Sequence, residues 1–219
     1  MSYYLYGLHR SGTNVLESSI GLNFPRYPSQ SNHTNFNKTW KHSFIGSESM
    51  PDNSIAIVIY KNIYTWLESV LIRSPYDGHH IYNATEKQIP DFNKFIKSID
   101  AKYYFVSNLV TVEGMVEVYF KFLKMHFFSG KNVHFVSYED LLIPETYNAL
   151  MHKLSKVFDK PLEKVKPLPT KVTLSPNYNK SSENYYLKGK TRFLPQDIVD
   201  CISDSIDKEF MNQLKSKTL

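Results

Sequence analysis

Several features that define common protein classes are scarce or missing in this sequence. Its 219 residues include one cysteine, Cys201, which excludes an intrachain disulfide. No apolar run approaches the roughly 20 residues that a membrane-spanning helix needs. The first residues also lack the basic region and long apolar region of a secretory signal. The simplest interpretation is a cytoplasmic protein without a membrane span.

Dense clusters of lysine and arginine are missing too, although the net charge is +5. A dedicated nucleic-acid binder usually gathers these residues on one face, so we expect no nucleic-acid partner. The mild positive charge is compatible with a smaller anionic ligand. Internal repeats and low-complexity tracts are also absent, and the length suits a single domain spanning residues 1–219.

The apolar pattern predicts strands that alternate with helices. Strands are expected over 3–6, 38–42, 55–60 and 133–136, helices over 13–20, 62–72, 91–99, 112–127 and 145–158, one final amphipathic helix over 198–214, and a long surface segment over 160–190. This alternation predicts an α/β fold, a three-layer sandwich around a central, mainly parallel sheet. In such sheets ligands bind outside the carboxyl ends of the strands.

The stretch GLHRSGTN follows the first predicted strand and nearly matches a phosphate-binding loop. Gly7 and Gly12 have the spacing of G-x-x-x-x-G-K-[ST], but Thr13 replaces the lysine and Asn14 replaces the magnesium-binding hydroxyl. A glycine turn into a helix directs backbone amides at one point, where the helix dipole favours an anion. Arg10 can supply the missing cation through its planar guanidinium, and Thr13 and Asn14 can add side-chain hydrogen bonds.

The missing hydroxyl indicates which ligand suits this loop. Phosphoryl transfer from a nucleoside triphosphate needs a metal to neutralise the phosphates, whereas a sulfuryl group carries less charge. Cationic side chains and amides can therefore serve a sulfuryl donor. The adjacent His79 and His80, close to Asp77, lack the further spacing of a metal site, and we expect no metal.

Three segments in order resemble the P-loop sulfotransferase family. GLHRSGTN is similar to the family's 5′-phosphosulfate loop, x-x-[KR]-S-G-T-x. IVIYKNIYTWLES places Lys61 at the end of a strand and Ser69 eight positions later, where the family usually has arginine and serine. FVSYEDLL is similar to a strand-to-helix segment common in these enzymes, and the resemblance spans 3–142.

The resemblance implies a P-loop-containing nucleotide hydrolase-like fold and the donor 3′-phosphoadenosine 5′-phosphosulfate. The residues expected at its 5′-phosphosulfate are Arg10 and the amides of Ser11, Gly12, Thr13 and Asn14. Lys61 and Ser69 would hold the 3′-phosphate, although lysine lacks the bidentate fork of arginine. LKGK, at 187–190, resembles a late basic-glycine element that touches the 3′-phosphate in some members.

Many members of the family carry a histidine near a lysine on the strand between the two donor-binding elements. NKTWKHSF occupies that stretch, so His42 is the candidate general base and Lys41 the candidate for stabilising the leaving oxygen. Adjacent strand residues face opposite sides, so both reach one site only where the strand ends or twists. The alternatives are Lys38 for the cation and His33, His79, His80, Glu17 or Glu48 for the base.

The leading hypothesis is a sulfotransferase that moves a sulfuryl group to an acceptor hydroxyl by in-line attack. His42 would remove the proton, while Arg10 and Lys41 would stabilise the charge on the leaving phosphate. A small alcohol or a glycan is the expected acceptor, and the sequence does not indicate an oligomeric state. Two alternatives stay open: a nucleotide kinase or NTPase with a degenerate loop, and an inactive sulfotransferase-like binding module.

Overall fold

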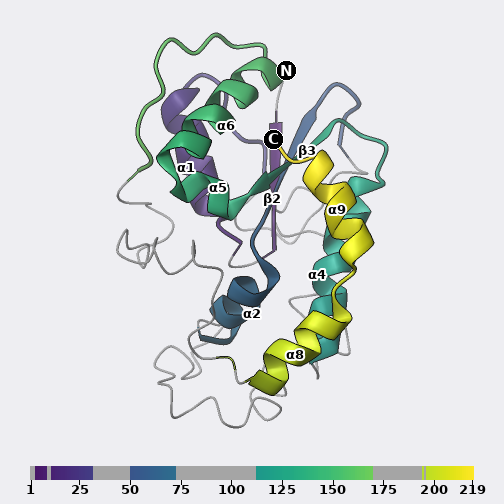
Figure 1. Ribbon diagram of the computed structural model, residues 1–219. Helices are drawn as coiled ribbons and strands as arrows, with labels where there is room; N and C mark the ends of the chain where they lie inside the picture. The colour runs from purple at the N-terminus through teal and green to yellow at the C-terminus, as the bar shows by residue number, and fades with distance from the viewer. Residues whose placement is uncertain (1–2, 9–10, 32–49, 73–111, 170–193, 195) are drawn as a thin grey trace, which may run out of the picture.

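The computed structural model describes residues 3–8, 11–31, 50–72, 112–169, 194 and 196–219 (Figure 1). The elements are β1 (Tyr3–Tyr6), α1 (Thr13–Asn23), β2 (Ile55–Tyr60), α2 (Ile63–Ile72), α4 (Val112–Phe127), β3 (Val133–Ser137), α5 (Tyr138–Leu142), α6 (Pro144–Val157), α8 (Gln196–Ser205) and α9 (Lys208–Ser216). The predicted strand over 38–42, the predicted helix over 91–99 and residues 170–190 of the predicted surface segment lie outside the described residues.

The three strands form one parallel sheet in the order β1-β2-β3. A single parallel bridge extends the sheet at each side, from Ser29 to Tyr3 of β1 and from Thr218 to Phe135 of β3. Beside β1, the hydroxyl of Ser31 donates to the Leu5 carbonyl at 2.8 Å and accepts from the Leu5 amide. The predicted α/β fold with a parallel sheet is therefore confirmed for the described residues.

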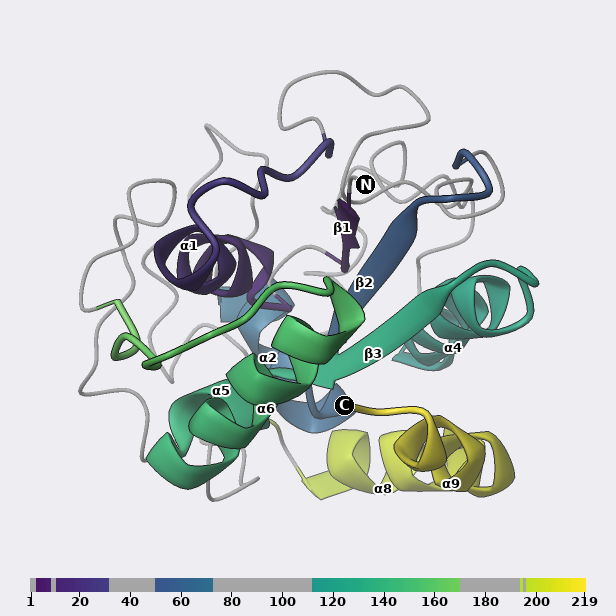
Figure 2. The ribbon, with the colours of Figure 1, turned by 90° about the horizontal axis from the view of Figure 1, so that it is seen from above.

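Helices cover both faces of this sheet, because β2 is buried on both sides. Successive side chains of a strand point to opposite faces. Ile55, Ile57 and Ile59 pack into a cluster with α1, α5 and α6, whereas Ala56, Val58 and Tyr60 pack into a cluster with α2, α4, α8 and α9. Figure 2 shows α1, α5 and α6 on one side of the strands and α4, α8 and α9 on the other. The unbroken apolar run of β2 is typical of such a central strand.

The connections leave β1 and β2 in opposite directions. After β1 the chain passes through α1 on one face and returns at Ser29, on the outer side of β1. Between β2 and β3 it passes through α2 and α4 on the other face. When two right-handed crossover connections run in opposite directions along a sheet, they lie on opposite faces of that sheet. The carboxyl ends of β1 and β2 therefore form a topological switch point, which is where ligands bind in open α/β sheets.

The final amphipathic segment is two helices, so the prediction of one helix over 198–214 is wrong. The break falls at Ile206 and Asp207, between α8 and α9. The Asp207 carboxylate accepts the Phe210 amide at 2.9 Å and caps α9. The apolar stripe continues across the break, since Ile202, Phe210 and Leu214 are all buried. The helical period of the apolar residues does not reveal this break, because both helices turn their apolar side toward the core and the period continues from one to the other.

No helix in the described part of the chain is both long enough and apolar enough to cross a membrane.

His126, on α4, is fully buried among aromatic rings. Its ring stacks on Tyr6 of β1 at 4.9 Å and meets Phe122 edge-on at 4.6 Å. Burial lowers the pKa of His126 from 6.5 to about 3, because the charged imidazolium would lose its hydration. No motif or spacing in the sequence singles out this group, which lies in the core as a neutral histidine.

We predict that His126 makes the protein less stable in mild acid. The unfolded chain binds this proton near pH 6.5 and the folded chain only near pH 3, so the stabilisation is complete above pH 6.5 and is lost as the pH falls toward 3. The free energy of unfolding should fall by about 2 kcal/mol between pH 7 and pH 5 from this group. Urea unfolding of wild type and His126→Phe at both pH values measures it.

The exposed His152→Gln is the control and should keep the wild-type pH dependence. Burial also lowers the pKa of the half-buried His134, which contributes equally in all three proteins. Equal losses in wild type and His126→Phe would contradict the prediction.

Candidate functional site

A tight glycine turn joins β1 to α1 at the switch point. The amide and the hydroxyl of Ser11 both donate to the Leu8 carbonyl, at 3.1 and 2.6 Å. Gly12 caps α1 in the left-handed region, with φ 95°, and no side chain caps the helix. The Ser11 hydroxyl is used within the turn and does not cap the helix.

Both glycines of the turn are required by close packing. A Cβ on Gly7 would lie 2.5 Å from the Ser11 hydroxyl oxygen and 2.7 Å from Ile59, and a Cβ on Gly12 would overlap the Tyr138 ring. The turn thus brings bare backbone to the start of α1. The first amides of a helix have no partner within it, and the helix dipole makes this end positive. The arrangement suits an anion.

Lys61 follows β2 directly, and only 2% of it is exposed. Its ammonium donates to the Ser69 hydroxyl at 2.7 Å, and that hydroxyl donates in turn to the Thr65 carbonyl at 2.6 Å. The Lys61 carbonyl accepts a 2.6 Å hydrogen bond from the Tyr119 hydroxyl. Burial raises the pKa of Tyr119 and keeps this donor protonated. The structure therefore brings Lys61 and Ser69 together, and their expected role at a 3′-phosphate stays a prediction.

A second set of contacts ties the end of β2 to the end of β3. The Asn62 amide donates to one oxygen of Glu139 at 3.0 Å, and the Ser137 hydroxyl donates to the other at 2.9 Å. The Asn62 side chain then accepts the Tyr64 amide at 3.0 Å at the start of α2. These contacts fix the backbone on the C-terminal side of Lys61.

Tyr138 lies between the glycine turn and Lys61. Its ring centroid is 5.2 Å from the Lys61 ammonium, and the ring fills the space beside Gly12. The sequence identified YED only as a fold element, which α5 confirms, and missed that Tyr138 and Glu139 contact the site. Their position gave the signal, since they directly follow the third strand as Gly7 and Lys61 follow the first two.

We use the name carboxyl edge for residues 7–8, 11–13, 61–69 and 137–139, where the three strands end. The carboxyl edge contains five of the predicted donor-binding residues: Ser11, Gly12, Thr13, Lys61 and Ser69. Asn14 occupies the first turn of α1. The predicted residues Arg10, Lys41 and His42, and the alternatives Lys38, His33, His79, His80, Glu48 and 187–190, lie outside the described residues and stay predictions.

Glu17, an alternative base, belongs to α1. Its carboxylate adds to the rise that burial causes in the pKa of Tyr3, the first residue of β1. A role for Glu17 as a base stays a prediction.

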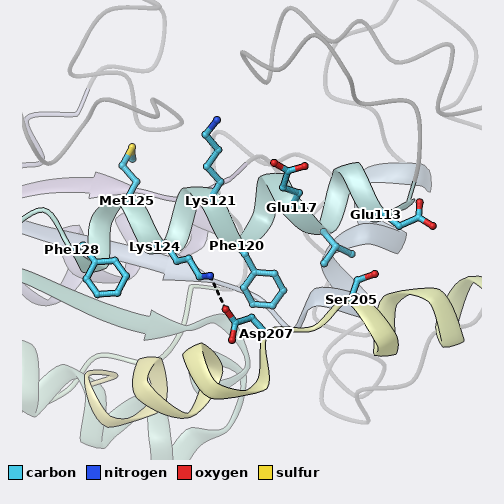
Figure 3. A pocket seen from close by; sticks show the side chains of 10 residues that line it. Glu113, Glu117, Phe120, Lys121, Lys124, Met125, Phe128, Ser205 and Asp207 are labelled. Atoms are coloured by element: carbon cyan, nitrogen blue, oxygen red, sulfur yellow. Dashed lines mark ion pairs between the residues drawn. The ribbon is translucent and has the colours of Figure 1, made fainter.

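A separate open groove of about 710 Å³ runs along α4 beside the junction of α8 and α9 (Figure 3). It is lined by Glu113, Val116, Glu117, Phe120, Lys121, Lys124, Met125, Phe128, Ser205 and Asp207. Lys124 and Asp207 form an ion pair of 2.6 Å across it. None of the carboxyl-edge residues lines this groove. Within the ranges that the structure describes, no group of three or more His, Cys, Asp or Glu residues could hold a metal ion.

We predict that Gly12→Ala destabilises the protein by about 1–3 kcal/mol, because alanine is strained at a positive φ and its methyl group would overlap the Tyr138 ring. Gly21→Ala is the matched control in the same helix. Nothing lies within 4 Å of a Cβ at Gly21, so alanine should stabilise the helix by up to about 1 kcal/mol. Urea unfolding measures both changes, and equal effects would contradict the role given to Gly12.

Comparisons with known proteins assign no family: no family model, no curated protein and no solved structure matches the chain. An argument about function therefore starts from the chemistry of the carboxyl edge itself. Bare backbone at the start of α1 and a buried ammonium on the neighbouring strand meet at the switch point.

Proposed function

We propose that the protein is a sulfotransferase that uses 3′-phosphoadenosine 5′-phosphosulfate and has a three-layer, P-loop-containing nucleotide hydrolase-like fold. One observation carries the proposal. The buried ammonium of Lys61, hydrogen-bonded to Ser69, lies on the strand next to the Gly12 turn at the switch point of a parallel sheet. Two sites for anions on neighbouring strands suit a ligand that carries phosphate groups at both ends of a nucleoside.

The described residues fit such a donor. The packing around Gly7 and Gly12 leaves no room for a side chain at either position, and α1 begins directly after Gly12 with its positive end. This end would receive the 5′-phosphosulfate, with Arg10 supplying a cation and Thr13 and Asn14 adding side-chain donors. When bound, the donor supplies a sulfuryl group for an acceptor hydroxyl.

Lys61 and Ser69 would receive the 3′-phosphate. An ammonium with little exposure binds an anion more strongly than a solvated one, because water screens it less. Its hydrogen bond to Ser69 and the hydroxyl's own bond to Thr65 hold both donors in fixed positions. Such preorganised groups need little rearrangement when a charged ligand arrives.

The residues proposed for proton transfer and charge stabilisation are predicted from the sequence and lie outside the described residues. His42 would accept the acceptor's proton, a role that typically contributes about 10²- to 10⁴-fold to the rate. Lys41 and Arg10 would stabilise the negative charge that develops on the donor side. A small alcohol or a glycan is the proposed acceptor class.

We predict that adenosine 3′,5′-bisphosphate raises the melting temperature without added metal. At 100 times its dissociation constant, a ligand that binds only the folded state adds about 2.7 kcal/mol of stability. Lys61→Gln and Ser69→Ala should each weaken this effect, because they remove the two donors that meet at 2.7 Å. Thermal denaturation with the bisphosphate, and with ATP in the presence and absence of Mg²⁺, measures it.

Lys131→Gln is the matched control for Lys61→Gln. Lys131 pairs with Asp52 before the start of β3, at the opposite end of the sheet, so its loss should leave the response to the bisphosphate intact. Stabilisation by Mg-ATP alone would contradict the sulfotransferase proposal and favour a kinase or NTPase. No response to any of these nucleotides would also contradict it and favour a binding module.

A further inference from the structure

Tyr138, in the described carboxyl edge, touches both proposed anion sites. It begins α5, directly after β3, and only 6% of it is exposed. One part of the ring lies against Gly12 of the glycine turn. The ring centroid also lies 5.2 Å from the ammonium of Lys61.

The contact with Lys61 has the geometry of a cation–π interaction. An ammonium within about 6 Å of a ring centroid is attracted by the negative face of the ring, and the attraction grows when both groups are removed from water. Both groups are buried here, at 6% and 2% exposed. The ring therefore attracts the Lys61 ammonium without a hydrogen bond, so the N–H donors of the ammonium are not used by this contact.

We propose that Tyr138 is a positioning residue whose aromatic face, rather than its hydroxyl, holds the Lys61 ammonium beside the glycine turn. A lysine side chain has many rotamers and loses much entropy when one is fixed. Tyr119 fixes the backbone of Lys61 through its carbonyl, while Ser69 and the Tyr138 ring fix the ammonium at the other end. Because the same ring packs on Gly12, it also sets the separation of the two anion sites.

The effect on ligand binding rests on the proposed function, but the position of Lys61 can be tested without any ligand. The test is acetylation of Lys61 by an N-hydroxysuccinimide acetate in the full chain, followed by peptide mass spectrometry. The rate at the exposed Lys215 serves as the internal reference. We expect Tyr138→Leu to raise the rate at Lys61 about tenfold, because the ring that retains the ammonium is lost. Tyr138→Phe should keep the wild-type rate.

Leu142→Ala is the control for general loosening, since Leu142 is a buried residue of the same helix. It should destabilise the protein and leave the rate at Lys61 near that of wild type. Tyr138→Met is the second ring-less variant, for use if Tyr138→Leu does not fold. An unchanged rate in the ring-less variant overturns the proposal, and so does an equal rise in Tyr138→Phe, which would point to the hydroxyl.

The second readout is the ratio of affinities for adenosine 3′,5′-bisphosphate and adenosine 5′-phosphate, measured by calorimetry. Tyr138→Leu should lower the bisphosphate affinity about tenfold and change the 5′-phosphate affinity little, a selective loss that mere unfolding does not give. Equal losses for both ligands would overturn the positioning role. Faster acetylation in a protein whose wild type binds no bisphosphate would support the role of Tyr138 and refute the proposed donor instead.

Discussion

The carboxyl edge depends on the burial of one positive charge, the ammonium of Lys61. Removing a charge from water is costly unless polar or aromatic partners replace the water. Partners of the ammonium include the Ser69 hydroxyl on α2 and the Tyr138 ring at the start of α5, while Tyr119 on α4 bonds the Lys61 carbonyl. Gly12 belongs to the same arrangement, because a side chain there would displace the Tyr138 ring.

The sheet explains why this charge lies where it does. β2 is covered on both faces, so its chain can leave the core only at its ends, and Lys61 is the first residue beyond its carboxyl end. The neighbouring β1 ends at the same edge, and the helix that follows it, α1, lies on the face of the sheet opposite to α2. A buried cation and the positive end of α1 are thereby placed side by side. An anionic ligand would relieve the concentration of positive charge there.

The sequence predicted the parts of this arrangement that local pattern determines. An unbroken apolar run identified β2, and a helical stripe identified α4. It missed what depends on contacts distant in sequence. Glycine is needed at position 12 because the Tyr138 ring, more than a hundred residues away in sequence, packs against it. The break before α9 depends on the side chain of Asp207. The helical periodicity of the sequence predicts neither of these contacts.

The central claim is that the carboxyl edge between β1 and β2 binds a ligand with two anionic groups. A titration of backbone amide chemical shifts with adenosine 3′,5′-bisphosphate tests it most directly, because every amide reports its own surroundings. The account predicts that the largest changes fall at Gly12, Thr13 and Lys61, on both neighbouring strand ends at once. Changes confined to the separate groove around Phe120 and Asp207, or no changes at all, would contradict it.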